Sequence, residues 1–228
     1  MPVGSVTVQP EPSALLPFQT VAQYAQLGIW LWDADGSVLL DVDQIESQFA
    51  YRRQFRRDFG YVVASAEVMA ILAELLQPVG LVLEAGCGSG YLSRELTRLG
   101  VPTFAVDCCD FREPRAEGQG YPISAVYQQD ALGDASTFVS ARFGAILLTW
   151  PPYSKPFALH VAQAMLPGQL LVYEGEGVGG CTADKDFFDF MGDVGLWERL
   201  PEASSRLNAV HVTLDGLHDR WMVWKRLG

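Results

Sequence analysis

The chain has 228 residues, 49% of them hydrophobic, and a formal net charge of −11. This length allows one full-sized α/β domain with an N-terminal extension and excludes two large domains. No apolar run approaches the ~18–20 residues that span a bilayer, so no membrane partner is expected. The negative charge disfavours a nucleic-acid partner, because it repels a phosphate backbone.

Cysteine usage and the first residues bear on the compartment. The four cysteines are Cys87, Cys108, Cys109 and Cys181, and their spacing matches no metal site. Two of them are adjacent, which is a poor arrangement for a disulfide. The sequence begins without the basic and apolar pattern of a secretion signal. We therefore expect reduced thiols in a cytoplasmic protein.

Residues 1–60 are predicted to form an N-terminal arm and a helical cap. Four prolines interrupt the first seventeen residues, whereas 18–60 has a helical pattern with Asp41 as an N-cap and Gly60 as its stop. An aromatic stripe, Tyr51, Phe55 and Phe59, runs beside a basic face made of Arg52, Arg53, Arg56 and Arg57.

Residues 61–228 form the second predicted unit, in which strands alternate with helices. The predicted helices are the one capped by Ser65, then 91–99, 155–166 and the segment from Thr182, as N-cap, to Met191. The predicted strands are 81–83, 103–107, 125–129, 145–149 and 169–173. Such alternation predicts an α/β fold with a mostly parallel, doubly wound sheet. Alternating residues at 210–214 and 221–225 add an antiparallel hairpin, for seven strands in all.

The most informative stretch is 82–90, Val-Leu-Glu-Ala-Gly-Cys-Gly-Ser-Gly. It reads as a strand, a tight glycine turn and the start of a helix, an arrangement in which a ligand touches the backbone. A dinucleotide-binding fingerprint would need glycine at position 91 or 93, where Tyr91 and Ser93 stand. The spacing therefore excludes that alternative.

Residues 84–90 resemble the first motif of class I S-adenosylmethionine-dependent methyltransferases, which consists of an acid followed by three glycines at alternate positions. The resemblance covers roughly 61–228 and implies a Rossmann-like fold with S-adenosyl-L-methionine as its cofactor. The turn residues that would contact the cofactor are Gly86, Cys87, Gly88 and Gly90.

Acidic residues follow the first three predicted strands, and the cofactor offers hydrogen-bond donors to each. The resemblance implies that Glu84 serves the methionine amine and Asp107 the ribose hydroxyls. Asp130, with its neighbour Ala131, would meet the adenine amine. Tyr61 is predicted to close over the methionine end, although a tyrosine there could equally belong to the core.

The acceptor side is expected beyond the fourth and fifth strands. Residues 150–153, Trp-Pro-Pro-Tyr, resemble the Asn/Asp-Pro-Pro-Tyr motif of amino-group methyltransferases. Trp150 departs from that motif, because an indole has no carbonyl to accept a hydrogen bond from an amine. What the resemblance retains is a rigid turn and Tyr153, which is suited to stacking. The alternative is a proline-stiffened loop with aromatic residues that fill the top of the domain.

Glu174 and Glu176 alternate with glycines after the fifth strand, and either is a candidate general base or cation anchor. The alternative is a flexible loop whose acids cap helices or face solvent. The three histidines, His160, His211 and His218, show no ligand spacing, and Asp33-Ala-Asp35-Gly36 lacks the later ligands of a calcium loop. No metal site is predicted.

These features predict a cytoplasmic methyltransferase that acts on a small molecule or a protein side chain, with residues 18–60 selecting the acceptor. The other interpretation of the arginine face is a solvated helix surface. A non-catalytic module that binds the cofactor, or serves as a partner subunit, is the second hypothesis, because Trp150 replaces the amide of the motif. A nucleic-acid N-methyltransferase is the third, disfavoured by charge.

Overall fold

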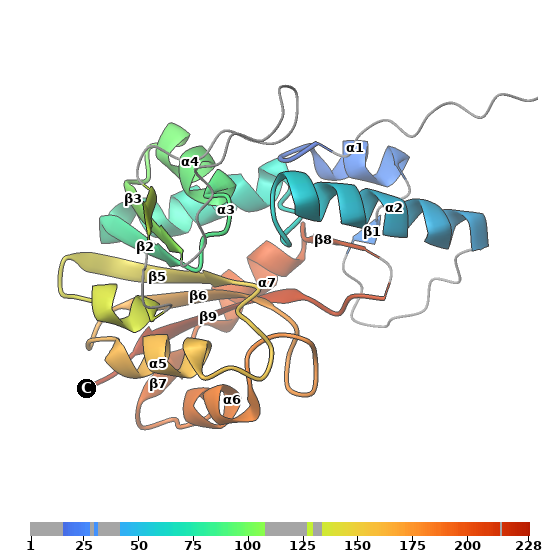
Figure 1. Cartoon of the computed structure of the whole chain (residues 1–228). Helices are drawn as coiled ribbons and strands as arrows, with labels where there is room; N and C mark the ends of the chain where they lie inside the picture. The colour runs from blue at the N-terminus through green and yellow to red at the C-terminus, as the bar shows by residue number, and fades with distance from the viewer. Residues whose placement is uncertain (1–15, 28–29, 32–41, 108–126, 130–133, 215) are drawn as a thin grey trace, which may run out of the picture.

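The computed structural model describes residues 16–27, 30–31, 42–107, 127–129, 134–214 and 216–228 (Figure 1). The helices are α1 (Val21–Gln26), α2 (Val42–Asp58), α3 (Ala66–Leu76), α4 (Tyr91–Arg98), α5 (Phe157–Ala164), α6 (Lys185–Met191) and α7 (Pro201–Asn208), with 3₁₀ turns η1 (Gln77–Val79) and η2 (Ala135–Phe138). The strands are β1 (Trp30–Leu31), β2 (Leu81–Ala85), β3 (Thr103–Asp107), β4 (Tyr127–Gln129), β5 (Phe143–Thr149), β6 (Leu170–Gly175), β7 (Trp197–Arg199), β8 (Val212–Thr213) and β9 (Arg220–Arg226). None of the helices in these ranges combines the length and apolar character that a bilayer span requires.

Within the described ranges, seven strands form one sheet in the order β4-β3-β2-β5-β6-β9-β7. Only β9 runs against the others, because it pairs antiparallel with both β6 and β7. The prediction of a seven-stranded, mostly parallel α/β sheet is confirmed. This strand order, with one reversed strand near the end of the chain, is that of class I methyltransferases, so the resemblance extends from the motif to the fold.

Helices cover both faces of the sheet, with α5 and α6 on one side and α3 and α4 on the other (Figure 1). Successive residues of β5 show why both faces are apolar. Ala145 and Leu147 pack in the core beneath α3 and α4, whereas Ile146 and Leu148 pack with α5 and α6. All four are fully buried. A central parallel strand needs apolar side chains in both directions, which explains the unbroken apolar run.

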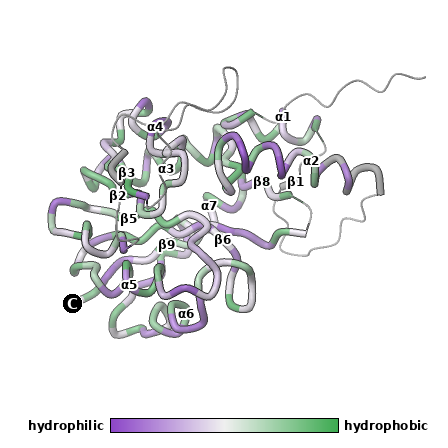
Figure 2. The backbone as a smooth tube through the Cα atoms, viewed as in Figure 1, coloured by the Kyte–Doolittle hydropathy of each residue, from purple (hydrophilic) through white to green (hydrophobic). Residues whose placement is uncertain are grey.

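The helical cap packs against the core that lies beneath α3 and α4. Tyr51 and Phe55 of the aromatic stripe are buried, and Phe55 is only 1% exposed. The tube of α2 carries hydrophilic as well as hydrophobic stretches, as expected for a helix with arginines beside aromatic residues (Figure 2). Arg57 pairs with Asp58 at 2.9 Å. The predicted cap residue Asp41 lies outside the described residues.

The predicted C-terminal hairpin is wrong in its pairing, although the antiparallel strand β9 is confirmed. Val212 and Thr213 pair with Leu31 and Trp30 in a separate two-stranded sheet. The second antiparallel partner of β9 is β7, which the sequence did not predict. Alternation between 210 and 214 reflects a strand with one buried face, and this pattern does not specify which strand it pairs with.

Candidate functional site

The glycine turn between β2 and α4 has the conformation that the motif predicts. Gly86, Gly88 and Gly90 have φ values of +74°, +56° and +71°, a region that other residues rarely adopt. A Cβ atom at Gly86 would also lie 3.2 Å from the ring of Phe157. The turn therefore needs glycine for its backbone shape, and a side chain at Gly86 would also crowd Phe157.

Glu84 lies beneath this turn and is 1% exposed. Its Oε2 accepts hydrogen bonds from the backbone N–H of Ser93, at 3.1 Å, and from the Ser93 hydroxyl. Its Oε1 has no hydrogen bond among the described residues. Burial raises the pKa of Glu84 to about 7, against the opposing effect of Ser93. A buried carboxylate oxygen left without a donor suits an ammonium group.

Asp107 ends β3 and binds the glycine turn from the other side. Its Oδ2 accepts a hydrogen bond from the backbone N–H of Gly88 at 2.7 Å. The third predicted acid, Asp130, and its neighbour Ala131 lie outside the described residues. Two of the three predicted acids are thus placed around the turn, where the parallel strands β2 and β3 end side by side.

A cavity of about 610 Å³ opens over this edge of the sheet, within the size range of small-molecule sites. The predicted site residues that line it are Tyr61, Glu84, Gly86, Cys87, Gly88, Asp107 and Trp150. Other lining residues were not predicted, among them Asp134, Ala135, Lys155, Phe157 and His160. They come from η2 and the start of α5, which carry no recognisable motif, and His160 shows no signal besides its ring.

Trp150 forms a wall of this cavity in an unusual backbone conformation. Its φ is +45°, which is strained for a bulky residue and is common at functional sites. Its backbone N–H donates to the carbonyl of Glu174 at 2.8 Å. Its ring stacks on Tyr61 with centroids 5.5 Å apart and planes at 23°. The Arg56 guanidinium lies 5.6 Å from the Tyr61 centroid, so aromatic and cationic groups meet at this wall.

Tyr153 does not line the cavity and is 62% exposed. The loop around it is tied down by backbone hydrogen bonds, in which Ala183 donates to Pro151 and Ser154 donates to Ala183. The loop after the Pro-Pro turn is thus anchored to Ala183, and Trp150 rather than Tyr153 lines the cavity.

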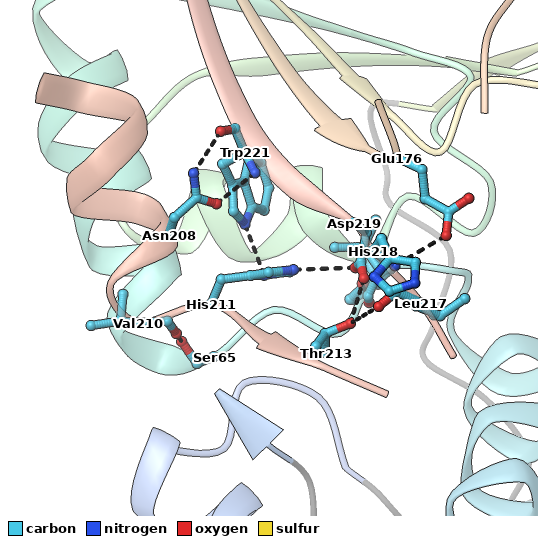
Figure 3. Close-up of polar contacts among 12 residues, drawn as sticks. Ser65, Glu176, Asn208, Val210, His211, Thr213, Leu217, His218, Asp219 and Trp221 are labelled. Atoms are coloured by element: carbon cyan, nitrogen blue, oxygen red, sulfur yellow. Dashed lines mark hydrogen bonds and ion pairs between the residues drawn. The ribbon is translucent and has the colours of Figure 1, made fainter. Parts of the chain in front are cut away.

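Both carboxyl oxygens of Glu176 accept hydrogen bonds from backbone N–H groups. Its Oε2 accepts from the backbone N–H of Cys181. Its Oε1 accepts from the backbone N–H of His218 at 3.0 Å (Figure 3). The predicted N-cap Thr182 is wrong, because Asp184 caps α6 by accepting from the Phe187 N–H at 2.9 Å. Thr182 lies just before that cap, and its hydroxyl binds the Tyr173 phenol and the Glu176 carbonyl instead.

Glu174 is fully buried and does not line the cavity. Burial raises the pKa of Glu174 well above its usual range, and the nearby Asp219 raises it further. Glu174, Asp219 and His211 form a cluster in which one atom of each lies within 4.8 Å of the others. The sequence did not predict this cluster, because its members come from separate segments that only the sheet brings together.

Comparison with solved structures finds methyltransferases at low similarity. Magnesium protoporphyrin IX methyltransferase from Synechocystis PCC 6803, with bound S-adenosylmethionine, is 14% identical with a TM-score of 0.47, over 84% of this chain and 86% of that one. The 1,6-didemethyltoxoflavin N1-methyltransferase of Burkholderia thailandensis is 13% identical with a TM-score of 0.43, over 88% and 95%. An rRNA methylase of Streptococcus thermophilus is 15% identical with a TM-score of 0.41, over 70% and 94%.

No protein-family model matches the sequence, and comparison with curated proteins finds no match either. The structural similarities concern the fold alone. The assignment of the fold rests on the strand order, in which β9 alone is reversed, together with the glycine turn after β2. The chain thus has the fold of the class I S-adenosylmethionine-dependent methyltransferases.

Proposed function

We propose that this protein is an S-adenosylmethionine-dependent methyltransferase whose acceptor is a small, flat molecule. One observation carries the cofactor assignment: the cavity contains a buried carboxylate oxygen, Glu84 Oε1, that has no hydrogen bond among the described residues. It lies beside a glycine turn open to ligand contact and a second acid, Asp107. Ammonium and ribose hydroxyl donors would satisfy these acceptors.

The protein residues would bind and orient the cofactor. Glu84 would accept from the amino group, Asp107 would accept from the ribose, and the backbone at Gly86 and Gly88 would lie against the nucleoside. When bound, the cofactor supplies an electrophilic methyl group on sulfur. Reaction then requires an oriented acceptor and the exclusion of water.

The acceptor preference is supported by the wall of the cavity. The stacked rings of Trp150 and Tyr61 offer flat surfaces, which favour a planar acceptor over a flexible protein side chain. Arg56 makes no ion pair among the described residues, and its cation lies near this stack. A flat acceptor with negative charge would therefore be favoured. The protein would work in the cytoplasm, where its thiols stay reduced.

Calorimetric titration of the full chain with S-adenosylmethionine and S-adenosylhomocysteine tests the assignment. We expect binding in the micromolar range, followed by slow S-adenosylhomocysteine formation when aromatic carboxylates or phenols are added. Absence of binding at millimolar concentration contradicts the proposal. Binding without turnover across the acceptor panel would favour a cofactor-binding module, for which the loss of the motif amide at Trp150 is the specific argument. Salt-dependent binding of oligonucleotides would instead favour a nucleic-acid acceptor.

A further inference from the structure

A cluster of polar side chains lies buried between the ends of β6 and β9, next to Trp150 in the sheet. Glu174 and His211 are fully buried, and Asp219 is 3% exposed. Glu174 is opposite Trp221 in the antiparallel register of β6 and β9, which brings it to Asp219 near the start of β9. Such a cluster is stable only if its protons are arranged so that donors meet acceptors.

The direction of the hydrogen bonds follows from one group that can only donate (Figure 3). The indole Nε1–H of Trp221 lies 3.2 Å from Nδ1 of His211. Nδ1 must therefore accept, and the neutral imidazole carries its proton on Nε2. Nε2 lies 3.2 Å from Oδ2 of Asp219, so His211 donates to this carboxylate.

Asp219 is therefore the acid that remains ionised. Its Oδ2 accepts from His211, and its Oδ1 accepts from the hydroxyl of Thr213 (Figure 3). Burial raises the pKa of Asp219, and the hydrogen bonds that it accepts from His211 and Thr213 act in the opposite direction. The negative charge of the pair is thus placed on Asp219.

Glu174 lacks comparable donors. Neither of its carboxyl oxygens makes a hydrogen bond among the described residues. Among the described residues, the other titratable groups that face it are His211, Glu176, Tyr91 and Tyr173. None of these is a cation once His211 is neutral. A buried carboxyl group next to an ionised carboxylate, with no cation to balance it, takes up a proton.

We propose that Glu174 and Asp219 share one proton, carried by Glu174, and that this neutral acid is a positioning residue for the indole of Trp150. The Glu174 hydroxyl donates to Asp219, which leaves its carbonyl oxygen for the Nε1–H of Trp150. That indole nitrogen is buried and makes no hydrogen bond among the described residues. Burial and Asp219 raise the pKa of Glu174, and Trp150, whose backbone N–H donates to the Glu174 backbone carbonyl at 2.8 Å, lowers it less strongly.

Glu174 would thereby hold Trp150 at two points. Its backbone carbonyl already accepts from the Trp150 N–H at 2.8 Å, where the tryptophan backbone is strained at φ +45°. A second bond to the indole fixes the orientation of the ring that lines the cavity. The inference concerns the acceptor wall of the proposed enzyme, but it requires no bound cofactor and is tested on the free protein.

A divalent cation would also remove the repulsion between the carboxylates of Glu174 and Asp219. Carboxylate and imidazole groups are common ligands of such ions. The tautomer of His211 argues against a metal. A metal ion on Nε2 would move the ring proton to Nδ1, where the Trp221 N–H already points. With a metal bound, the N–H groups of His211 Nδ1 and Trp221 would point at each other. With a shared proton, each donor has an acceptor.

Infrared spectroscopy of the full chain tests the proton directly. At about pH 8.5, above the pKa of about 7 of Glu84, we expect the carbonyl stretch of one protonated carboxyl group. This band should vanish in Glu174→Gln and persist in the matched variant Glu84→Gln, which alters another buried glutamate. A band that survives in Glu174→Gln, or no band in the wild-type protein, overturns the shared proton.

Fluorescence tests the positioning role. The emission of Trp150 is obtained by subtracting the spectrum of the corresponding Trp150→Phe protein, in the wild-type, Glu174→Ala and Glu174→Gln backgrounds. We expect a red shift and stronger acrylamide quenching in the Ala background only, because glutamine keeps a carbonyl for the indole and an N–H for Asp219. Identical spectra in all three backgrounds, or equal shifts for Ala and Gln, overturn the role.

Metal titration distinguishes a proton shared by Glu174 and Asp219 from a metal ion bound to them. The free wild-type protein is titrated with Zn²⁺ and with Mn²⁺, and its melting temperature is followed with and without a chelator. We expect no stabilisation that depends on Glu174. Stabilisation by either ion that is lost in both Glu174→Gln and Asp219→Asn would replace the proton by a metal site.

Discussion

Glu84 and Glu174 occupy comparable places, near the carboxyl ends of the parallel strands β2 and β6. Both are almost completely buried, and each has at least one carboxyl oxygen without a hydrogen bond among the described residues. Glu84 nevertheless lines the cavity, whereas Glu174 lies next to Asp219 and does not. The pKa of Glu84 rises to about 7, and that of Glu174 rises well above its usual range.

The contrast shows that burial alone does not assign a role to an acid. Ser93 donates twice to Glu84 and limits the rise of its pKa, so a ligand cation can readily bring it to the ionised form. Glu174 has a like charge beside it and no access to the cavity. One glutamate is therefore suited to respond to a ligand, and the other to remain a neutral structural group.

The strongest test of the proposed cofactor site is the substitution Asp107→Ala. We expect S-adenosylhomocysteine to bind roughly 100-fold more weakly, because two hydrogen bonds to a charged group contribute about 1.5 kcal/mol or more each and 1.4 kcal/mol is tenfold in affinity. The N–H of Gly88 also loses its partner. Calorimetry measures the change. Asp193→Ala, at a surface carboxylate that accepts from Gly195, is the matched control. Equal affinity of the two variants contradicts the proposed site.

Glu84→Gln should weaken S-adenosylhomocysteine binding about tenfold at pH 8, with a smaller loss at pH 6. In the free wild-type protein Glu84 titrates at about pH 7. An ammonium group favours its ionised form, so binding below pH 7 must release a proton. Wild-type affinity therefore falls as the pH drops from 8 to 6, by up to about tenfold per unit, and the variant should lack this dependence.

The same group makes the stability of the free protein depend on pH. A raised pKa in the folded state contributes stability that is present below the unfolded value and is lost as pH rises through about 7. The wild type should therefore lose more stability than Glu84→Gln between pH 5 and 8, by up to ~3 kcal/mol. Thermal unfolding at matched ionic strength measures this difference. Parallel curves for the two proteins would show that Glu84 is ionised throughout.

The proposed cofactor site and the cluster around Glu174 also differ in how far the sequence could predict them. The glycine turn, Glu84 and Asp107 were predicted because a strand, a turn and a helix are determined by neighbouring residues. The cluster around Glu174 was not, since Asp219 and His211 meet it only through the register of β6 with β9 and the loop before β9. Glu174 was predicted as a general base from its place after a strand, and its environment was not visible in the pattern.

Short elements escaped prediction for a related reason. Strand β7 has three residues, and α7 begins directly after it. A strand of three residues is too short to show a period. The hairpin at 210–225 failed because alternation identifies a strand with one buried face but not its partner. By contrast, β3, α3 and α4 have the expected type and nearly the expected bounds, since each carries its own cap or apolar pattern.

The substitutions Trp150→Ala and Trp150→Phe test the proposed acceptor wall of the cavity. With S-adenosylhomocysteine bound, we expect benzoate to bind roughly fivefold more weakly to the Ala variant, because a ring pair contributes ~0.5–1.5 kcal/mol beyond its buried area. Phenylalanine keeps a flat ring and should lose less. Affinity of S-adenosylhomocysteine itself should change little in the Phe variant. If benzoate binds to both variants as tightly as to the wild-type protein, Trp150 does not form the acceptor wall.

The smallest expected effect compares two arginines of α2. Arg56 lies 5.6 Å from the centroid of Tyr61, whereas Arg53 is exposed with no such contact among the described residues. Both substitutions, Arg56→Gln and Arg53→Gln, remove one positive charge from the same helix, so long-range electrostatics change by a similar amount in each. We expect benzoate to bind about two- to fivefold more weakly only in Arg56→Gln, because an exposed cation–π contact contributes ~0.5–1 kcal/mol. An equal loss in both variants would mean that the cap attracts anions through its overall charge, and Arg56 would then have no specific part in acceptor choice.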